Sequence, residues 1–262
     1  MGEKTLMTAR QSRLIALSLF VTFSLAPLCL VNSVEAGSLF FSEYAEGSGN
    51  QKVVEIYNPT GSAIDLSDYA FPTVSNAPAT PGEYEYWNTF TEGAEIEAGG
   101  TYVITHTNPN QYGSGTTNDY EDVSDQTYQY LSNGDDGMAL VKGTEGDFEV
   151  LDWIGNWDGR PSGGWDVAGV SKATKDRTLV RKPTILTGNP SWASAAGTTA
   201  ENSEWLVFDK DSYVNGNAEY LASATVGNHT VEAGVIPEPT SILLVLFGLS
   251  WVSLLKLRSP RA

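Results

Sequence analysis

Between Gly37 and Thr230 the sequence contains no periodic apolar stretch of a length that would make a useful helix. Short apolar or alternating runs recur instead, separated by clusters of Gly, Pro, Asn and Asp, a pattern typical of an all-β sandwich or barrel. Residues 72–87 and 107–128 are long polar insertions between such runs. We expect strands at Leu39–Tyr44, Lys52–Tyr57, Ala63–Leu66, Thr101–His106, Gly137–Lys142, Phe148–Ile154, Thr178–Arg181 and Glu204–Phe208.

The first 36 residues have the pattern of an export signal. Lys4, Arg10 and Arg13 precede the apolar run Leu14–Val31, which is followed by the segment Val34-Glu35-Ala36. A basic head, an apolar middle and a small residue before the cut are what signal peptidase recognises, so we expect cleavage between Ala36 and Gly37. The alternative is an anchor helix that is not cleaved.

The last residues, 231–262, have a different pattern. The segment Pro237-Glu238-Pro239 precedes an apolar run at about 241–255, and Lys256, Arg258 and Arg261 follow it. As a helix this run is roughly 22 Å long, shorter than the ~30 Å core of a bilayer. Because cations flank the outer side of both apolar runs, the positive-inside tendency predicts two cytoplasmic ends and an external body.

This tail resembles the PEP-CTERM sorting signal of Gram-negative bacteria. The three matching parts are Pro237, Glu238 and Pro239, the apolar run from Ile242, and the basic cluster from Lys256 to Arg261. The resemblance implies that an exosortase cuts near the Pro-Glu-Pro, and that the protein works alongside exopolysaccharide and biofilm machinery. An ordinary membrane anchor is the alternative.

Charge and cysteine content narrow the class of partner. The chain has 15 Lys and Arg against 32 Asp and Glu, which gives a net charge of −17. Binding to nucleic acid phosphates needs clustered cations, so we expect no nucleic acid partner. Cys29 is the single cysteine and leaves with the signal peptide, so the mature protein has no disulfide.

Eight collinear pieces of the body form a recognisable series. They are Leu39–Ser48, Val54–Thr60, Ala63–Tyr69, Asn133–Leu140, Leu151–Gly155, Arg177–Lys182, Glu204–Leu206 and Gly227–Thr230. In this order they resemble the lamin-tail domain over about residues 38–230. The resemblance implies an immunoglobulin-like β-sandwich for residues 37–230, here with long loop insertions. It also implies an alternative role, because bacterial lamin-tail domains accompany extracellular nucleases and phosphatases.

One group of polar residues offers hard oxygen ligands. Asn133, Asp135 and Asp136 lie together between two expected strands, and such oxygens suit Ca²⁺. The alternative is a tight hairpin turn whose side chains cap local amides. Other acidic groups, Asp209 with Asp211 and the Asp119–Asp125 segment, are weaker candidates. No certain cofactor follows, and Ca²⁺ is the metal left open.

The two histidines give no catalytic pattern. His106 ends an expected strand and His229 lies among the closing residues of the resemblance, and neither stands in a hydrolase motif. We interpret both as structural and expect no catalytic residue.

Aromatic residues gather in two places. Trp157 and Trp165 lie in a Gly-rich segment after the expected strand that contains Trp153, and Tyr84, Tyr86 and Trp87 lie in the first insertion. Exposed rings of this kind stack on sugars, whereas the plainer interpretation is core packing or loop anchoring.

The sequence therefore predicts an exported, non-catalytic surface module with a binding or structural role, processed by signal peptidase and exosortase. Extracellular polysaccharide or surface proteins are the expected partners. The alternatives are an accessory domain, a weak metal-dependent extracellular hydrolase of nuclease or phosphoesterase type, and a protein that stays anchored in the membrane by its C-terminal helix.

Overall fold

The structure is a computed structural model that describes residues 37–107, 123–212, 226–229 and 231–232. The predicted signal segment through Ala36, the Pro237–Pro239 motif, the apolar run at 241–255 and residues 119–122 lie outside these ranges. Within the described ranges no helix is long and apolar enough to span a membrane. The regular elements of the described chain are β-strands, apart from one short α-helix, α1 (Trp192–Ala196), and a 3-10 turn at Leu66–Asp68.

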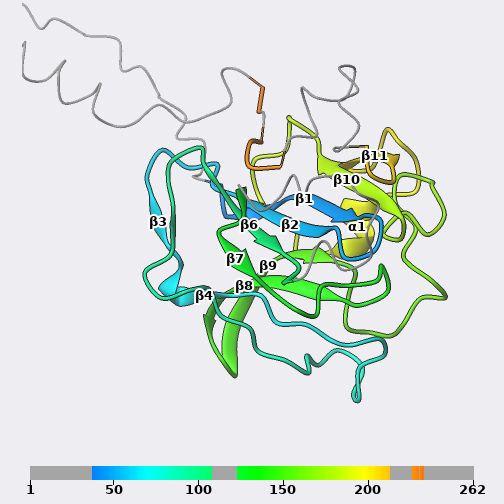
Figure 1. Ribbon diagram of the computed structural model, residues 1–262, viewed down its shortest axis with the longest axis horizontal. Helices are drawn as coiled ribbons and strands as arrows, with labels where there is room; N and C mark the ends of the chain where they lie inside the picture. Colours follow the sequence, from blue (N-terminus) through cyan, green and yellow to red (C-terminus); the bar gives the residue numbers. More distant parts are fainter. Residues whose placement is uncertain (1–36, 108–122, 213–225, 230, 233–262) are drawn as a thin grey trace, which may run out of the picture. The chain divides into compact units, whose positions relative to one another are not determined.

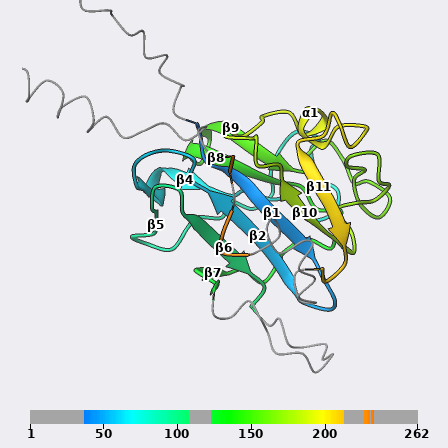
Figure 2. The same ribbon diagram turned by 90° about the horizontal axis from the view of Figure 1, so that it is seen from above.

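Two sheets face each other in this part of the chain (Figures 1 and 2). The larger has six strands in the order β11-β10-β1-β2-β6-β7, antiparallel except for the parallel pair β6–β7. The smaller has the order β4-β8-β9, and β3 and β5 form a separate two-stranded ladder. The strand bounds are β1 (Phe40–Glu46), β2 (Lys52–Tyr57), β3 (Ile64–Asp65), β4 (Tyr69–Ala70), β5 (Glu95–Ile96), β6 (Thr101–Thr105), β7 (Gln126–Thr127), β8 (Met138–Thr144), β9 (Asp147–Ile154), β10 (Arg177–Arg181) and β11 (Trp205–Asp209).

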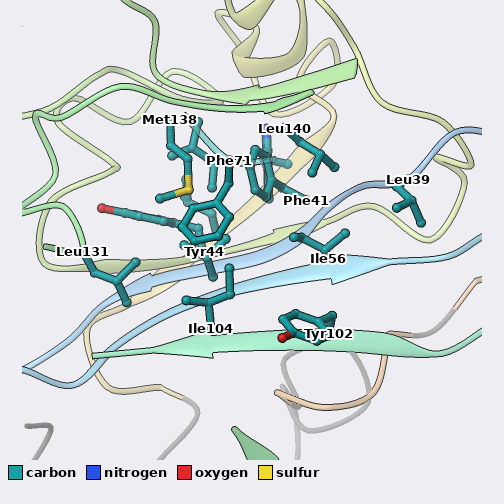
Figure 3. Packing of buried hydrophobic residues seen from close by; sticks show 14 of the residues in the cluster. Leu39, Phe41, Tyr44, Ile56, Phe71, Tyr102, Ile104, Leu131, Met138 and Leu140 are labelled. Carbon is teal, nitrogen blue, oxygen red and sulfur yellow. The ribbon is translucent and has the colours of Figure 1, made fainter. Parts of the chain in front are cut away.

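The main core lies between the two sheets, where their apolar side chains meet (Figure 3). Tyr102 and Ile104 come from the six-stranded sheet, and Met138 and Leu140 come from the three-stranded one. Each such side chain stabilises the fold by roughly 1.5–3 kcal/mol through burial. This packing confirms an all-β architecture of the sandwich type.

The central strand β2 is covered on both faces. All six of its residues are buried, because the side chains that face away from the main core pack under a later segment of the chain. Val53, Ala45 and Val103 form a small cluster there with Val226. His229 continues this cover and packs edge-on against Tyr57. A strand buried on both faces loses the apolar–polar alternation of a half-exposed strand.

The predicted strands are confirmed, with ends that shift by at most two residues, and β2 has the predicted bounds. β4, β5 and β7 were not predicted. Each is two residues long, too short for a pattern of alternating apolar residues to show in the sequence.

Candidate functional site

One cavity in the described part of the chain has a volume of about 490 Å³. It lies where the start of β2, the segment after β4, the turn after β7 and the loop before β8 meet. A volume of this size lies within the range of small-ligand sites in proteins. The lining residues are Asn50, Lys52, Thr73, Val74, Ser75, Asn76, Tyr86, His106, Tyr128, Gln129, Tyr130, Leu131, Asn133 and Asp136. We call this cavity the tyrosine pocket.

Two tyrosines give the pocket exposed aromatic surface. Tyr86 is 53% exposed and Tyr130 is 69% exposed, and in the described part of the chain they are the exposed large apolar residues. Tyr130 packs edge-on against Tyr128, with ring centroids 5.9 Å apart, and Tyr128 in turn packs edge-on against Phe71 of the core at 5.5 Å. The core therefore anchors the platform that carries Tyr130.

Lys52 organises the floor of the pocket. Its side chain is almost fully buried, and its Nζ donates to the carbonyl oxygen of Ser132 at 2.9 Å, to that of Leu131 at 3.5 Å, and to Oδ1 of Asn133. Burial lowers the pKa of Lys52, and the carboxylate of Glu46 is the largest influence in the opposite direction. The ammonium thus holds the loop that precedes β8 against the end of β2.

That loop, residues 131–136, is closed by its own hydrogen bonds. The hydroxyl of Ser132 accepts from the amides of Gly134 at 2.9 Å and Asp136 at 3.0 Å. Thr174 donates its hydroxyl to the carbonyl of Gly134 at 2.6 Å. Gly134 has a φ of 94°, and a Cβ there would lie 2.7 Å from the backbone of Lys175, so only glycine fits.

The oxygens proposed as Ca²⁺ ligands already have protein partners. Oδ2 of Asp135 accepts from Arg160 at 2.7 and 2.6 Å, Asp136 accepts from the amide of Asn76, and Asn133 accepts from Lys52. No three His, Cys, Asp or Glu side chains gather as a metal site in the described ranges. The loop is a tight turn of the alternative kind, closed by Ser132, and Ca²⁺ binding there stays a prediction that would require displacing these donors.

The weaker acidic candidates are also engaged by protein donors. Asp209 pairs with Arg177, and Asp211 accepts from the amide of Ser48 at 2.8 Å. Asp125, the described end of the Asp119–Asp125 group, accepts from the amide of Val103 at 2.8 Å.

The structure places Trp157 as the core-packing interpretation expects and not as a displayed ring. Its side chain is only 5% exposed and packs edge-on against Trp153 at 4.6 Å. Trp165 is half-buried and packs against Trp192 and the main core. The sequence placed these residues in a Gly-rich segment but could not show that both rings fold inward.

The first insertion divides between two environments. Tyr84 and Trp87 are half-buried and pack with Phe148 and Trp157 in a second apolar cluster. Of the five aromatic residues suggested for ligand stacking, Tyr86 alone lines the tyrosine pocket. Tyr128 and Tyr130, which sequence reasoning missed, complete it. Their pattern, Tyr-Gln-Tyr on a turn, is too short to mark a site.

The histidines lie in different places. His106 lines the tyrosine pocket, and burial lowers its pKa, with the nearby Lys52 charge acting in the same direction. His229 is buried between Phe40 and Tyr57, where burial lowers its pKa to about 4 with a further contribution from Arg181. Each imidazole is therefore neutral at pH 7.

Comparison with known proteins gives one match to a family model. The family model for the Lamin Tail Domain matches residues 32–155, a range that contains β1 to β9. No curated protein matches the chain. Among solved structures, the crystal structure of a DUF4876 family protein from Bacteroides thetaiotaomicron VPI-5482 aligns with 13% identity and a TM-score of 0.37, covering 78% of this chain and 75% of that chain. Residues 32–155 of this mostly β chain are therefore similar to a lamin tail domain.

Proposed function

We propose that this chain is an exported, non-catalytic surface module that binds extracellular polysaccharide in the tyrosine pocket. The observation that carries the proposal is the pair Tyr86 and Tyr130, two exposed rings on a cavity that is otherwise lined mainly by polar side chains. A sugar ring presents an apolar C–H face and a rim of hydroxyls, and it fits a site that offers aromatic faces beside hydrogen-bonding groups.

The polar lining supplies both donors and acceptors. The side-chain amides of Asn76 and Gln129 can each donate and accept a hydrogen bond, and the carboxylate of Asp136 can accept one. Tyr128 is held by the core through Phe71, so part of the platform is rigid before a ligand arrives. A preformed site loses less conformational entropy on binding.

Charge favours a neutral or cationic glycan over a polyanionic one. The ammonium of Lys52 already donates to three protein oxygens and so contributes little to an incoming anion. The carboxylate of Asp136 contributes negative charge to the lining, and the net charge of the whole chain is −17. An acidic polysaccharide would be repelled by this field.

The test for ligand binding uses the purified full-length chain in a detergent that carries no sugar. Neutral gluco- and N-acetylhexosamine oligosaccharides are titrated by calorimetry against the wild type and the Tyr86→Ala/Tyr130→Ala variant. Loss of both rings should weaken binding by tenfold or more, about 1.4 kcal/mol. The Tyr86→Phe/Tyr130→Phe variant keeps the rings and should retain most of the affinity.

Two results would contradict the binding role. One is equal affinity in the alanine and wild-type proteins. The other is robust turnover of nucleic acid, phosphoester or glycan substrates, with or without divalent metal, that is lost in His106→Ala or His229→Ala. The second result would establish the hydrolase alternative.

The export proposal rests on the two ends of the sequence, Leu14–Val31 with Ala36, and Pro237–Pro239 with the basic tail. Its test is the intact mass of the protein recovered from membrane, outer-surface and medium fractions of its host. A species that begins near Gly37 and lacks the residues after Pro239 supports signal peptidase and exosortase processing. A membrane-bound species that retains the tail would mean a permanent anchor.

A further inference from the structure

An amine, a carboxylate and a side-chain amide meet beside the floor of the tyrosine pocket. Nζ of Lys52 donates to Oδ1 of Asn133 and lies 3.9 Å from Oε1 of Glu46. Glu46 on β1 is the register partner of Lys52 on β2, whereas Asn133 lies 81 positions further along the chain. These are the parts that transfer of an acyl group to an amine requires, namely a nucleophile, a base and an acyl carbon.

The acyl carbon of Asn133 is within reach of the amine. Nζ is hydrogen-bonded to Oδ1, and a C=O bond is only about 1.2 Å long, so Nζ lies within about 4 Å of Cγ. Reactive separations are about 3–3.5 Å, which a small rotation of either side chain reaches. The carbonyl oxygens of Ser132 and Leu131 also accept from Nζ and hold it in this position. The amine is therefore placed beside the amide before any reaction begins.

Burial prepares the amine and its base for proton transfer. Lys52 is 4% exposed and Glu46 is 7% exposed. Burial lowers the pKa of Lys52 and raises that of Glu46, and both shifts favour movement of a proton from the ammonium to the carboxylate. Asn133 is exposed, so ammonia released from it can reach solvent. The titratable groups that face Lys52 are Glu46 on β1, Asp135 and Asp136 in the loop, Asp176 before β10 and His106 after β6.

We propose that Lys52 and Asn133 form an intramolecular isopeptide bond, which joins Nζ to the side-chain carbon of Asn133. Glu46 takes a proton from the ammonium, and the freed electron pair of Nζ attacks Cγ. The bond between Cγ and the amide nitrogen breaks, and this nitrogen takes a proton from Nζ and leaves as ammonia. The ammonia accepts the proton held by Glu46 and departs as ammonium ion, which restores the carboxylate. This reaction does not depend on the polysaccharide proposal, since it needs no ligand.

The bond links strand β2 of the six-stranded sheet to the loop that leads into β8 of the three-stranded one. The chain has a single cysteine, so no internal disulfide can make such a link. A side-chain amide is a weak electrophile, and we therefore expect the reaction to be slow. Freshly purified protein retains the free ammonium that the structure shows, and the crosslink accumulates with time.

The experiment follows the intact mass of the purified full-length chain during several days at neutral pH, without any glycan. Loss of ammonia should lower the mass by about 17 Da. Tryptic digestion should then yield one joined pair of peptides, one containing Lys52 and the other Asn133, with no cleavage after Lys52. Because the bond closes a long loop, the melting temperature of the crosslinked form should rise by roughly 10 °C.

The digest also separates the crosslink from a rival reaction. Gly134 follows Asn133, and attack of its peptide nitrogen on the same carbon gives a cyclic imide with the same loss of mass. That imide leaves Lys52 free and open to trypsin, whereas the isopeptide bond does not. In the structure the amide of Gly134 donates to the hydroxyl of Ser132 at 2.9 Å, which engages the rival nitrogen.

Variants assign the roles of the three groups. Asn133→Ala changes an exposed residue and should abolish the joined peptides while the fresh protein stays folded. Glu46→Gln removes the base and should slow the reaction by about a hundredfold at neutral pH. Its remaining rate should rise with pH, whereas the wild-type rate should stay nearly constant because the proton moves within the pair. Lys142→Arg alters an exposed lysine of β8 and is the matched control, with an unchanged yield.

Three outcomes would overturn the proposal. An unchanged mass, with both peptides recovered separately, would leave Lys52 and Asn133 a hydrogen-bonded pair only. A loss of mass with trypsin still cleaving after Lys52 would assign the change to the cyclic imide. Joined peptides that form equally fast in Glu46→Gln, with the same pH profile, would remove Glu46 from the reaction.

Discussion

Arg181 and Lys52 are both cations withdrawn from solvent, but they meet different partners. Arg181 lies in the sandwich with no exposed side-chain surface and pairs with Asp152, which is equally buried. Lys52 lies at the start of β2 and donates mainly to carbonyl and amide oxygens of one loop. The first cation meets carboxylates deep in the fold, and the second shapes the wall of a cavity.

Arg181 joins the two sheets. From β10 it reaches Asp152 on β9, donates to Glu204 at 2.9 Å and to the carbonyl of Phe41 at 3.2 Å, and stacks over Trp205 at 4.2 Å. Asp152 in turn accepts from the amide of Phe41 at 2.9 Å. A planar guanidinium can satisfy several acceptors and a ring face at once, which an ammonium cannot.

The partners of each cation therefore indicate its role: Arg181 stabilises the whole sandwich, and Lys52 shapes the tyrosine pocket. A charge whose partners come from both sheets holds the sandwich together, and its loss is felt globally. Lys52 donates to neighbouring residues of a single loop, so its charge fixes the local shape of that loop. Removing this charge should change the cavity before it changes the rest of the fold.

The largest effect is expected for Arg181→Met. Removing the guanidinium leaves the Asp152 carboxylate buried without its cation, which should lower the free energy of unfolding by about 3–5 kcal/mol in urea denaturation. The double variant Arg181→Met/Asp152→Asn removes both charges and should recover part of that loss. If the single variant were as stable as the wild type, the pair would contribute nothing to holding the sheets.

An intermediate effect is expected for Lys52→Met. The methylenes still pack, but the oxygens of Leu131, Ser132 and Asn133 lose their donor, so stability should fall by about 1–3 kcal/mol. Glycan affinity at the tyrosine pocket should fall with it. A loss of stability as large as that of Arg181→Met, with glycan affinity retained, would contradict the contrast between the two cations.

The smallest effect is a pH dependence that reports the burial of His229, with a smaller contribution from the charge of Arg181. The folded-state pKa of His229, about 4, lies below its ordinary value of 6.5. Between these values the unfolded chain binds more protons, so the native state loses stability as pH falls through that window. His229→Phe, which can keep the edge contacts with Phe40 and Tyr57, should gain about 1 kcal/mol relative to the wild type at pH 5.5 and almost nothing at pH 7.

Glu55 acts in the opposite direction and must be separated from this effect. Burial raises its pKa to about 7, so its contribution to stability is lost as pH rises from about 4.5 through 7. Comparing wild type and His229→Phe at each pH cancels the Glu55 contribution. A difference that does not change between pH 5.5 and 7 would mean that His229 titrates normally in the folded protein.

Local pattern explains where sequence reasoning succeeded. The run Lys52–Tyr57 is apolar and β-branched and is bounded by turn residues, and it forms β2 at the predicted bounds. The group Asn133–Asp136 was recognised as a turn or a metal loop because Asn, Gly and Asp favour tight backbone geometry. The structure makes it a turn closed by Ser132 and held by Lys52.

Long-range contact explains where it did not succeed. Lys52 and Ser132 are 80 positions apart, and no local pattern indicates that an ammonium would meet those oxygens. The sequence left Trp157 open between display on a Gly-rich segment and core packing, and Tyr84 covers it from a segment that is remote in the sequence. Nothing in the sequence around Tyr130 indicates a binding site, and only the structure shows that Tyr130 and Tyr86 line the same cavity.

The sequence by itself determined the longer strands, the turns and the acidic character of this protein, because periodicity, glycine and proline act over a few neighbouring residues. Only the tertiary structure decided which faces are covered, which aromatic rings stay exposed and which oxygens surround each buried cation. Those outcomes depend on side chains that meet across two sheets. A period of two identifies the faces of a strand but not what packs against them.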